Sequence, residues 1–550
     1  MHSRMVAPSL GMKTSSSSFS YMTFRILTLV VATGNALWPF HASANTNRPP
    51  NFVVVMADDM GFSDLGSHGG EIATPNLDRL AYGGLRFVQF YNTGRCWPTR
   101  ASMLTGYYAQ QIRMDPPSGR LPQWAHLLPQ YLKSVGYRSY HSGKWHVNGA
   151  PKPVADGGFD QSYVAADSDR HFYPIRHEQN DQPLPPVEPG TSYYSTTAII
   201  DHAIECLREH DEKHADKPFF QYVAFLAPHF PLHALPSDIA AYRDRYTVGW
   251  DVIRQQRAQR VLEIGISDCK PRQLDSKLRT RYFEPRFLTK LGPAEVDHAV
   301  PWHTLTADQQ HFQAGKMAIH AAMVHRIDLE IGRLLQQLQT MNAFDNTVFM
   351  FLSDNGADAT ILIRGDGHDS TASPGSGPSY LCLGPGWASA CNSPFHRHKI
   401  WVHEGGIATP LIVHWPNGIH DRGELRRTVG HVIDILPTLL ELAGVKRGPA
   451  SSGNEAPPLA GLSLVPSFSN DDVIKRKYLF FHHQGNRALR MGHWKIVSAT
   501  DDGNAWQLYN LEDDRGETID LAAELPARVQ QMAARWQELE TEYRRLAADP

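Results

Sequence analysis

Short apolar runs that alternate with helical segments constrain the fold of this chain more than any other feature of its sequence. The runs are rich in β-branched and aromatic residues, and they predict strands at residues 51–56, 138–142, 219–226, 347–353 and 411–415. Strands that alternate with helices are typical of βαβ units, in which helices cover a mostly parallel sheet. We therefore expect an α/β fold built on a large mixed, mostly parallel sheet sandwiched by helices.

Two helices stand out between these strands. One opens at Thr74-Pro75-Asn76-Leu77-Asp78, where Thr74 is placed to cap the helix, Pro75 fits its first position and Asp78 adds an acid to the first turn. The other presents apolar side chains at three- and four-residue steps, which mark one buried face. Its apolar positions are Val324, Ile327, Ile331, Leu334, Leu335 and Leu338. We interpret this second helix as scaffold.

The 550-residue chain divides into four parts. Residues 1–44 have the pattern of a signal peptide, 45–447 form the large α/β domain, 448–469 form a linker rich in Pro, Gly and Ser, and 470–550 form a smaller C-terminal α+β domain. A terminal helix is expected from about Pro526. Strands of the small domain are predicted at residues 478–482, 488–490, 494–497 and 506–509.

The N-terminal segment carries the three features of a secretory signal. Arg25 supplies a positive charge, residues 26–40 form an apolar run, and Ala42-Ser43-Ala44 provides an Ala-x-Ala cleavage site. The apolar run is shorter than the roughly 20 residues of a spanning helix, so we expect no membrane anchor. We expect an exported protein, periplasmic or secreted, and translation from Met22 would give the more compact signal.

Charge and cysteine content exclude other classes of protein. Lys and Arg number 53 against 56 Asp and Glu, so the chain lacks the basic excess that non-specific binding to nucleic acid requires. Five cysteines are too few and too scattered for a disulfide scaffold, and no Cys-x-x-Cys or His-Glu-x-x-His spacing indicates zinc. The odd thiol is assigned to Cys96, and the pairing of the others stays open: Cys206, Cys269, Cys382 and Cys391.

Two long stretches interrupt the alternation of strands and helices. Residues 236–306 are charged and irregular, and residues 357–398 are rich in Gly, Ser and Pro. Long loops inside a compact domain are usually functional or disordered, so we expect these two to set substrate specificity. Neither contains a dominant basic run, and so neither favours a polyanionic polymer over a small ester as substrate.

Oxygen-bearing side chains directly follow two of the predicted strands. Asp58 and Asp59 come after the first strand, and Asp354 and Asn355 come after the strand at 347–353. Ligands of open α/β sheets bind at the carboxyl ends of the strands. An isolated Asp pair is more often a solvated turn. Four oxygen donors on two strand ends, however, indicate a site for Ca²⁺ or Mg²⁺.

The segment from Cys96 to Gly106 reads Cys-Trp-Pro-Thr-Arg-Ala-Ser-Met-Leu-Thr-Gly, with Pro98 placed to start a helix. A lone cysteine is more often a small buried hydrophobe. Here, however, Cys-x-Pro-x-Arg followed by Leu-Thr-Gly resembles the signature of the type I sulfatases. In that family the cysteine is converted after translation to Cα-formylglycine. Thr99 stands where the family usually has serine.

Further motifs extend the resemblance over nearly the whole chain after residue 45, in the order expected for the arylsulfatase group of the alkaline-phosphatase superfamily. In the large domain they are Ala57-Asp58-Asp59, Thr74-Pro75-Asn76-Leu77-Asp78, Gly143-Lys144-Trp145-His146, Ala227-Pro228-His229-Phe230-Pro231, Asp354-Asn355-Gly356, and Lys399 with Glu404-Gly405-Gly406. In the small domain they are Gly485-Asn486-Arg487-Ala488, Gly492-His493-Trp494-Lys495 and Leu508-Tyr509-Asn510-Leu511.

The resemblance implies an enzyme that hydrolyses sulfate esters with a formylglycine nucleophile at position 96 and one Ca²⁺ ion. Its substrate would be a sulfated small molecule or carbohydrate, and a formylglycine-generating enzyme would be a partner. The implied metal ligands are Asp58, Asp59, Cys96 in its modified form, Asp354 and Asn355.

The remaining implied roles concern the sulfate group and its protons. Lys144 and Lys399 contact the sulfate, His229 protonates the leaving alcohol, and His146 is the base that restores the aldehyde. Arg100, one helical turn from Cys96, orients the hydrated aldehyde.

Two other functions stay open at this point. One is hydrolysis of phosphonate or phosphate esters by the same fold and nucleophile, and the other is binding of sulfated glycans without turnover. Among the remaining residues, His233 is a weaker candidate for substrate contact, and residues 246–254 fit packing better than recognition. Four further histidines receive no role: His396, His398, His482 and His483.

Overall fold

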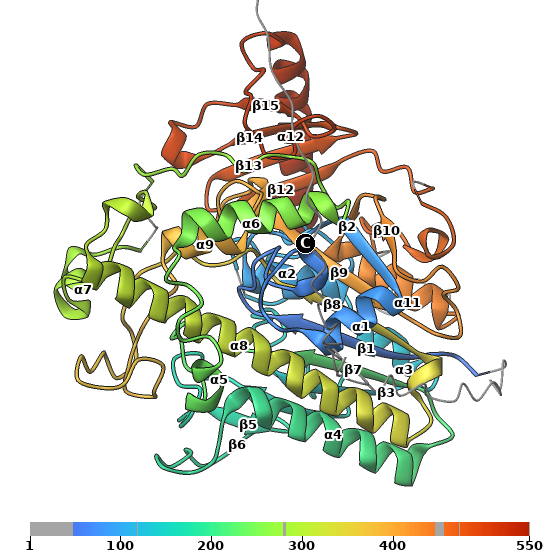
Figure 1. The fold of residues 1–550 in the computed structure, drawn as a ribbon. Helices are drawn as coiled ribbons and strands as arrows, with labels where there is room; N and C mark the ends of the chain where they lie inside the picture. Colours follow the sequence, from blue (N-terminus) through green and yellow to red (C-terminus); the bar gives the residue numbers. More distant parts are fainter. Residues whose placement is uncertain (1–47, 118, 279–281, 446–455, 472, 549–550) are drawn as a thin grey trace, which may run out of the picture. The chain divides into compact units, whose positions relative to one another are not determined.

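The computed structural model (Figure 1) describes the chain over five ranges, which are residues 48–117, 119–278, 282–445, 456–471 and 473–548. The signal peptide predicted at residues 1–44 lies outside the described residues. The linker predicted at 448–469 lies partly outside them.

Four parallel strands form the centre of the main sheet, in the spatial order β8, β1, β7 and β3. Their bounds are β1 Asn51–Ala57, β3 Arg138–Gly143, β7 Phe219–Ala224 and β8 Thr347–Ser353. β9 (Ala408–His414) pairs antiparallel with β8, and β2 (Leu85–Tyr91) pairs antiparallel with β9. All five predicted strands are therefore present, and the sheet is mixed and mostly parallel, as expected.

Shorter strands extend this sheet at both edges, which gives it 11 strands within the described ranges. β4, β5 and β6 continue the order beyond β3, while β10 and β11 both pair with β2. Their bounds are β4 Gln161–Ala165, β5 His177–Gln179, β6 Gln182–Pro183, β10 Glu424–Arg426 and β11 Gly430–His431.

Side chains of β1 alternate between two hydrophobic cores, one on each face of the sheet. Val53 and Val55 pack into the core that contains α1, α4 and α8, whereas Phe52 and Val54 pack into the core that contains α2, α3 and α11. Figure 1 shows α4 and α8 side by side along the sheet. The helix bounds are α1 Pro75–Gly83, α2 Cys96–Thr105, α3 Leu128–Lys133, α4 Ser195–His214, α8 Ala307–Thr340 and α11 Ile435–Leu442.

Helix α8 confirms the predicted scaffold helix. It begins with a capping box, in which the Gln309 amide donates to the Thr306 hydroxyl and the Gln309 side chain accepts from the Thr306 amide. All six apolar side chains of the predicted face are buried in the core.

Helix α1 begins as predicted, with Thr74 at the N-cap and Pro75 in the first turn, but the Thr74 side chain makes no capping hydrogen bond. The Thr74 hydroxyl donates to Asp78 instead of accepting from the first turn of α1. The free amides of Asn76 and Leu77 donate to the carboxylate of Asp328 on α8. A charged acceptor from a neighbouring helix thus replaces the local cap, which sequence spacing alone does not reveal.

The prediction that residues 236–306 are irregular is also wrong, because three helices occupy much of that stretch. They are α5 Pro236–Ala240, α6 Trp250–Glu263 and α7 Pro285–Leu291. Helix α6 buries Arg257, whose guanidinium lies 2.7 Å from Asp64 and 2.8 Å from Glu71. Since α6 binds the core partly through ion pairs, its apolar periodicity is weak. In the other long stretch, 357–398, only α9 Pro385–Cys391 is helical among the described residues.

The C-terminal part forms a separate antiparallel sheet of four strands covered by the terminal helix, as predicted. The strands pair in sequence order, and the Phe480 ring stacks on Trp536 of the helix. The bounds are β12 Leu479–His483, β13 Asn486–Met491, β14 Trp494–Ser498, β15 Gln507–Asn510 and α12 Pro526–Ala547.

Glu404, in the short helix α10 (Glu404–Ile407) before β9, connects this small sheet to the main one. Its carboxylate accepts from Tyr91 of β2 at 2.8 Å and pairs with Lys495 of β14 at 2.9 Å. Lys495 also pairs with Glu517 at 2.8 Å, and all of these side chains are buried. The link therefore consists of charges that have little access to water.

All five cysteines lie in described residues, and none is bonded to another. Among the described helices, none combines the length and the apolar character needed to cross a bilayer.

The Lys495→Met variant tests the buried link between the sheets. We expect it to lower the free energy of unfolding by about 3–5 kcal/mol, because it leaves buried carboxylates of Glu404 and Glu517 without their ammonium partner. Urea unfolding followed by circular dichroism measures the change. Lys477→Met, at an exposed position, is the matched control and should change stability by less than about 0.5 kcal/mol. Equal losses in both variants would contradict a buried ionic link.

Candidate active site

The segments that carry the predicted site residues all meet at one edge of the main sheet. The four central strands are parallel, so their carboxyl ends lie together. β9 runs the opposite way, so the segment before it, with Lys399, reaches the same edge, as does the segment with Cys96 that follows β2. The residues after the central strands are Lys144 after β3, His229 after β7, Asp58 after β1 and Asp354 after β8.

The register of β1 and β8 explains why their carboxylates are adjacent. Ala57 and Ser353 are the last paired residues of the two strands, so Asp58 and Asp354 follow at equivalent positions. The Asp59 amide donates to Asp354 Oδ1 at 3.2 Å, which joins the two turns directly. Asp59 has φ 69°, a left-handed conformation that is uncommon outside glycine and occurs at constrained functional sites.

Gly356 allows the turn after β8 to pack closely against the segment before β9. A Cβ atom at this position would lie 1.9 Å from the Gly405 carbonyl oxygen, so no other residue fits without displacing the backbone. The Gly356 amide also donates to the Gly406 carbonyl at 3.0 Å. The glycines in these two motifs therefore bring Asp354 and Lys399 to one site.

Three buried cations neutralise the acidic cluster. Lys144 pairs with Asp58, and Arg100 pairs with Asp354 at 2.6 Å. Lys399 lies 2.7 Å from Asp59. Burial alone raises the pKa of Asp58, but the neighbouring cations, Lys144 foremost, together outweigh it and hold that pKa well below the ordinary value.

The helix that carries Cys96 starts earlier than predicted. α2 begins at Cys96 itself, with Pro98 two residues inside the helix. Cys96 therefore lies at the positive end of the helix, near Asp58 and Asp354, and it is 3% exposed. Burial raises the pKa of the Cys96 thiol, but the cations of Lys144, Lys399 and Arg95 together outweigh it, and the net shift is downward.

Both predicted catalytic histidines belong to this cluster. His229 Nδ1 donates to the Phe230 carbonyl, which leaves Nε2 directed at Asp59, 3.6 Å away. Burial, followed by the nearby Lys399, lowers the pKa of His229 well below its ordinary value. His146 has φ 50° and a buried Nδ1 without a hydrogen-bond partner. Burial and the adjacent Lys144 likewise lower the pKa of His146.

The acidic cluster has the properties of a cation site. Asp58 Oδ1 and Asn355 Oδ1 are buried, and neither accepts a hydrogen bond from a described residue. Burial, with repulsion from Asp58, raises the pKa of Asp354 to about 7, and burial also raises the pKa of Asp59. Hard oxygen ligands that lie close together and accept no hydrogen bond suit Ca²⁺ or Mg²⁺. The residues present therefore fit such an ion.

Sequence reasoning missed three contributors to the site. Asp358 lies 3.0 Å from Lys399 and groups with Asp59 and His229. A carboxylate four residues after Asp354 was the available signal, but it falls within a stretch that the sequence marks only as a loop. The other two are Arg95, which lies beside Cys96, and Tyr222, which lies beside Arg100. Neither residue belongs to a motif that the sequence analysis could use.

Other candidates lie outside the cluster. His233 Nε2 donates to the Ser379 carbonyl at 2.7 Å, and its ring contacts His171. Tyr246 and Trp250 are buried in the core, which confirms the packing interpretation for that part of residues 246–254, whereas Arg254 lines a separate polar pocket. His483 pairs with Asp115 at 2.8 Å.

Two family models match the chain. The model named Sulfatase covers residues 50–445, and the model named N-sulphoglucosamine sulphohydrolase, C-terminal, covers residues 395–544.

Relatives are similar over most of the chain. An uncharacterized sulfatase of Schizosaccharomyces pombe is 30% identical over 546 residues, which covers 90% of this chain and 94% of that protein. The arylsulfatase of Klebsiella aerogenes is 30% identical over 464 residues, with 77% and 93% covered. The N-acetylgalactosamine-6-sulfatase of Rattus norvegicus is 26% identical over 491 residues, with 84% and 74% covered.

Solved structures share the fold. The crystal structure of Ps i-CgsB in complex with k-i-k-neocarrahexaose has a TM-score of 0.64 at 22% identity, covering 91% of this chain and 95% of that chain. A protein in complex with its substrate D-glucosamine-2-N,6-O-disulfate has a TM-score of 0.62 at 20% identity, covering 90% and 98%. Together with the family model over residues 50–445, these findings show that the chain belongs to the sulfatase family and is a sulfate ester hydrolase.

Proposed function

We propose that this enzyme uses a formylglycine formed from Cys96 and a Ca²⁺ ion to release inorganic sulfate from its ester. The observation that carries the proposal is the buried cluster of Asp58, Asp354 and Cys96, in which Asp58 Oδ1 lacks a donor. A structural cysteine needs neither carboxylates nor lysines beside it.

The two groups supply distinct chemistry. Hydrated formylglycine supplies one hydroxyl that displaces the alcohol from sulfur and a second that allows sulfate to be expelled as the aldehyde re-forms. Ca²⁺, when bound, supplies positive charge to the sulfate oxygens. We propose that its ligands are Asp58, Asp59, Asp354, Asn355 and the modified residue 96.

The chain's own cations stabilise the charge that develops on the sulfate. Lys144 and Lys399 are held by carboxylates at one end of the site, so their ammonium groups are positioned before substrate binds. Arg100 donates to Asp354 through both Nε and Nη2, and it fixes this carboxylate next to position 96. We propose that Arg100 acts through Asp354, as a positioning residue.

Two histidines move the protons. The Phe230 carbonyl accepts from His229 Nδ1, so in the imidazolium form Nε2 carries the proton that passes to the leaving oxygen. Burial and Lys399 lower the pKa of His229, so this form depends on the negative charge of the bound sulfate ester. His146 is neutral because burial and Lys144 lower its pKa, and it therefore accepts a proton when sulfate is expelled. After sulfate leaves, His146 returns its proton to water and His229 regains one. The net release of one proton per turnover matches the conversion of an ester monoanion and water to an alcohol and a sulfate dianion.

We propose a sulfated carbohydrate as the substrate class. Supporting this, one relative is an N-acetylgalactosamine-6-sulfatase, and one structural neighbour was solved with the substrate D-glucosamine-2-N,6-O-disulfate. Export through the predicted signal peptide and modification by a formylglycine-generating enzyme complete the proposal.

Cys96→Ala tests the nucleophile. We expect sulfate release from a generic aryl sulfate to fall by at least about 10³-fold, because the variant cannot form the aldehyde. Ion chromatography of inorganic sulfate measures the rate, after co-expression with a formylglycine-generating enzyme and addition of Ca²⁺. Mass spectrometry of the peptide around residue 96 checks the modification.

Cys269→Ala is the matched control for this variant, because Cys269 lies outside the cluster and should be dispensable for turnover. Phosphate monoesters and diesters are assayed in parallel. Faster release of phosphate than of sulfate, or full activity in Cys96→Ala, would contradict the proposed chemistry.

Removal of the metal tests the cation site. We expect chelation with EGTA to abolish sulfate release and lower the melting temperature, and Ca²⁺ to restore both, because Asp59 and Asp354 then lose their compensating charge. Asn355→Ala should raise the Ca²⁺ concentration needed for half-maximal activity by about tenfold. Activity and melting temperature that do not respond to EGTA would exclude a catalytic Ca²⁺ here.

A further inference from the structure

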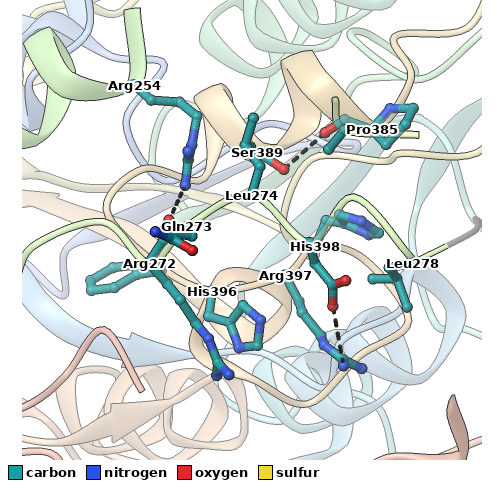
Figure 2. Close-up of a pocket in the computed structure, with 13 residues that line it drawn as sticks. Arg254, Arg272, Gln273, Leu274, Leu278, Pro385, Ser389, His396, Arg397 and His398 are labelled. Carbon is teal, nitrogen blue, oxygen red and sulfur yellow. Dashed lines mark hydrogen bonds and ion pairs between the residues drawn. The ribbon is translucent and has the colours of Figure 1, made fainter. Parts of the chain in front are cut away.

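A second polar pocket lies beside the active site, and both stretches that the sequence marks for specificity line it (Figure 2). Residues 236–306 contribute Arg254, Arg272 and Asp275, and residues 357–398 contribute His396, Arg397 and His398. The two stretches are far apart in sequence, yet every residue that lines the pocket belongs to one of them.

The pocket is rich in hydrogen-bond donors that have no acceptor. Arg397 Nε and Nη1, Arg254 Nε, and the Nδ1 atoms of His396 and His398 are buried, and none has a hydrogen-bond partner in the described part of the chain. Arg397 is 7% exposed and His398 is 4% exposed. Buried donors without acceptors are costly, so their accumulation in one pocket points to a ligand that accepts hydrogen bonds.

Positive charge in the pocket exceeds its local compensation. Arg397 pairs with Asp502 at 2.7 Å and lies 3.8 Å from Asp275. Arg254, by contrast, donates only to the Arg272 carbonyl at 2.7 Å among the partners within the described ranges. Burial lowers the pKa of Arg254 to about 10, and the carboxylate of Asp251, three residues earlier on α6, opposes this shift without cancelling it.

Figure 2 shows the His396 ring between the guanidinium groups of Arg272 and Arg397. Burial, followed by those two cations, holds the pKa of His396 well below its ordinary value. The neutral ring then presents a donor without adding a further charge. A cation would be repelled from this position, whereas an oxyanion would accept from several donors at once.

The pocket and the sulfate site share one short loop. His398 lines the pocket, and the next residue, Lys399, pairs with Asp59 and Asp358 in the active site. Burial lowers the pKa of His398 to about 4, and the nearby carboxylate of Asp358 opposes this shift. We propose that the pocket bounded by Arg254, Arg272 and Arg397 binds an oxyanion, either a second sulfate group of the substrate or free inorganic sulfate. Binding of a sulfate group of the substrate rests on the proposed function, whereas binding of free sulfate does not.

Sulfate binding tests the pocket without turnover. Equilibrium dialysis of labelled inorganic sulfate is run against the Ca²⁺-loaded Lys399→Ala enzyme, in which the active site has lost one sulfate contact. The further change that an arginine variant causes in this background reports the pocket. We expect Arg254→Gln added to this variant to weaken the remaining binding about tenfold, as for one charge-assisted hydrogen bond. Arg272→Gln is the second variant, and Arg208→Gln on α4 makes the same charge change at a distant, exposed site.

Kinetics identify the source of the oxyanion. The kcat/KM for a disulfated disaccharide is compared with that for its monosulfated counterpart, in the wild type and in Arg254→Gln. If the second sulfate occupies the pocket, the preference for the disulfated sugar falls about tenfold in Arg254→Gln, while turnover of the monosulfated sugar is retained. Weaker sulfate binding with an unchanged preference identifies free sulfate as the occupant.

Unchanged sulfate binding and unchanged preference in both arginine variants would overturn the proposal. Retained hydrolysis of the monosulfated sugar in those variants shows that the fold and the catalytic site are intact. Failure of the proposed function has a different signature, which is absence of sulfate release from every ester in the wild-type enzyme.

Discussion

The structure depends on how buried negative charge is neutralised where β1 and β8 end. The paired strands deliver Asp58 and Asp354 to the same place, in an interior where like charges repel strongly. Lys144 and Arg100 compensate one carboxylate each, and Lys399 compensates two further ones. The acidic oxygens that stay without hydrogen-bond donors are the ones that the proposed divalent cation would bind.

A buried lysine shared by two carboxylates also occurs at the boundary of the small sheet, where it has a different role. Lys495 is as deeply buried as Lys399, and it too is shared by two carboxylates. Its partner Glu404 also accepts from Tyr91 of β2 and from Arg515, so both of its carboxylate oxygens are hydrogen-bonded. Such a cluster links the small sheet to the main one. The acidic cluster, in contrast, contains oxygens that accept no hydrogen bond and that a ligand could contact.

The neighbouring pocket shows the opposite polarity. Its unpaired atoms are donors on Arg254, Arg397 and two histidines, while the unpaired atoms of the acidic cluster are the acceptors of Asp58 and Asn355. One loop, which contains both His398 and Lys399, separates the two sites. A substrate with several anionic groups would place one of them at the cation site and another at the guanidinium groups, on either side of this loop.

The sequence by itself determined the strands, the scaffold helix and the residues at the strand ends, because apolar periodicity and polar residues at strand ends are local patterns. Only the tertiary structure decided which groups neutralise the charged residues at the strand ends. Asp328 replaces the local cap of α1, Arg257 holds α6 through Asp64, and Asp358 joins Lys399, all through partners distant in sequence or without a motif. The pocket of Arg254 and Arg397 also arises only on folding. Charge compensation acts through space, so spacing along the chain does not encode it.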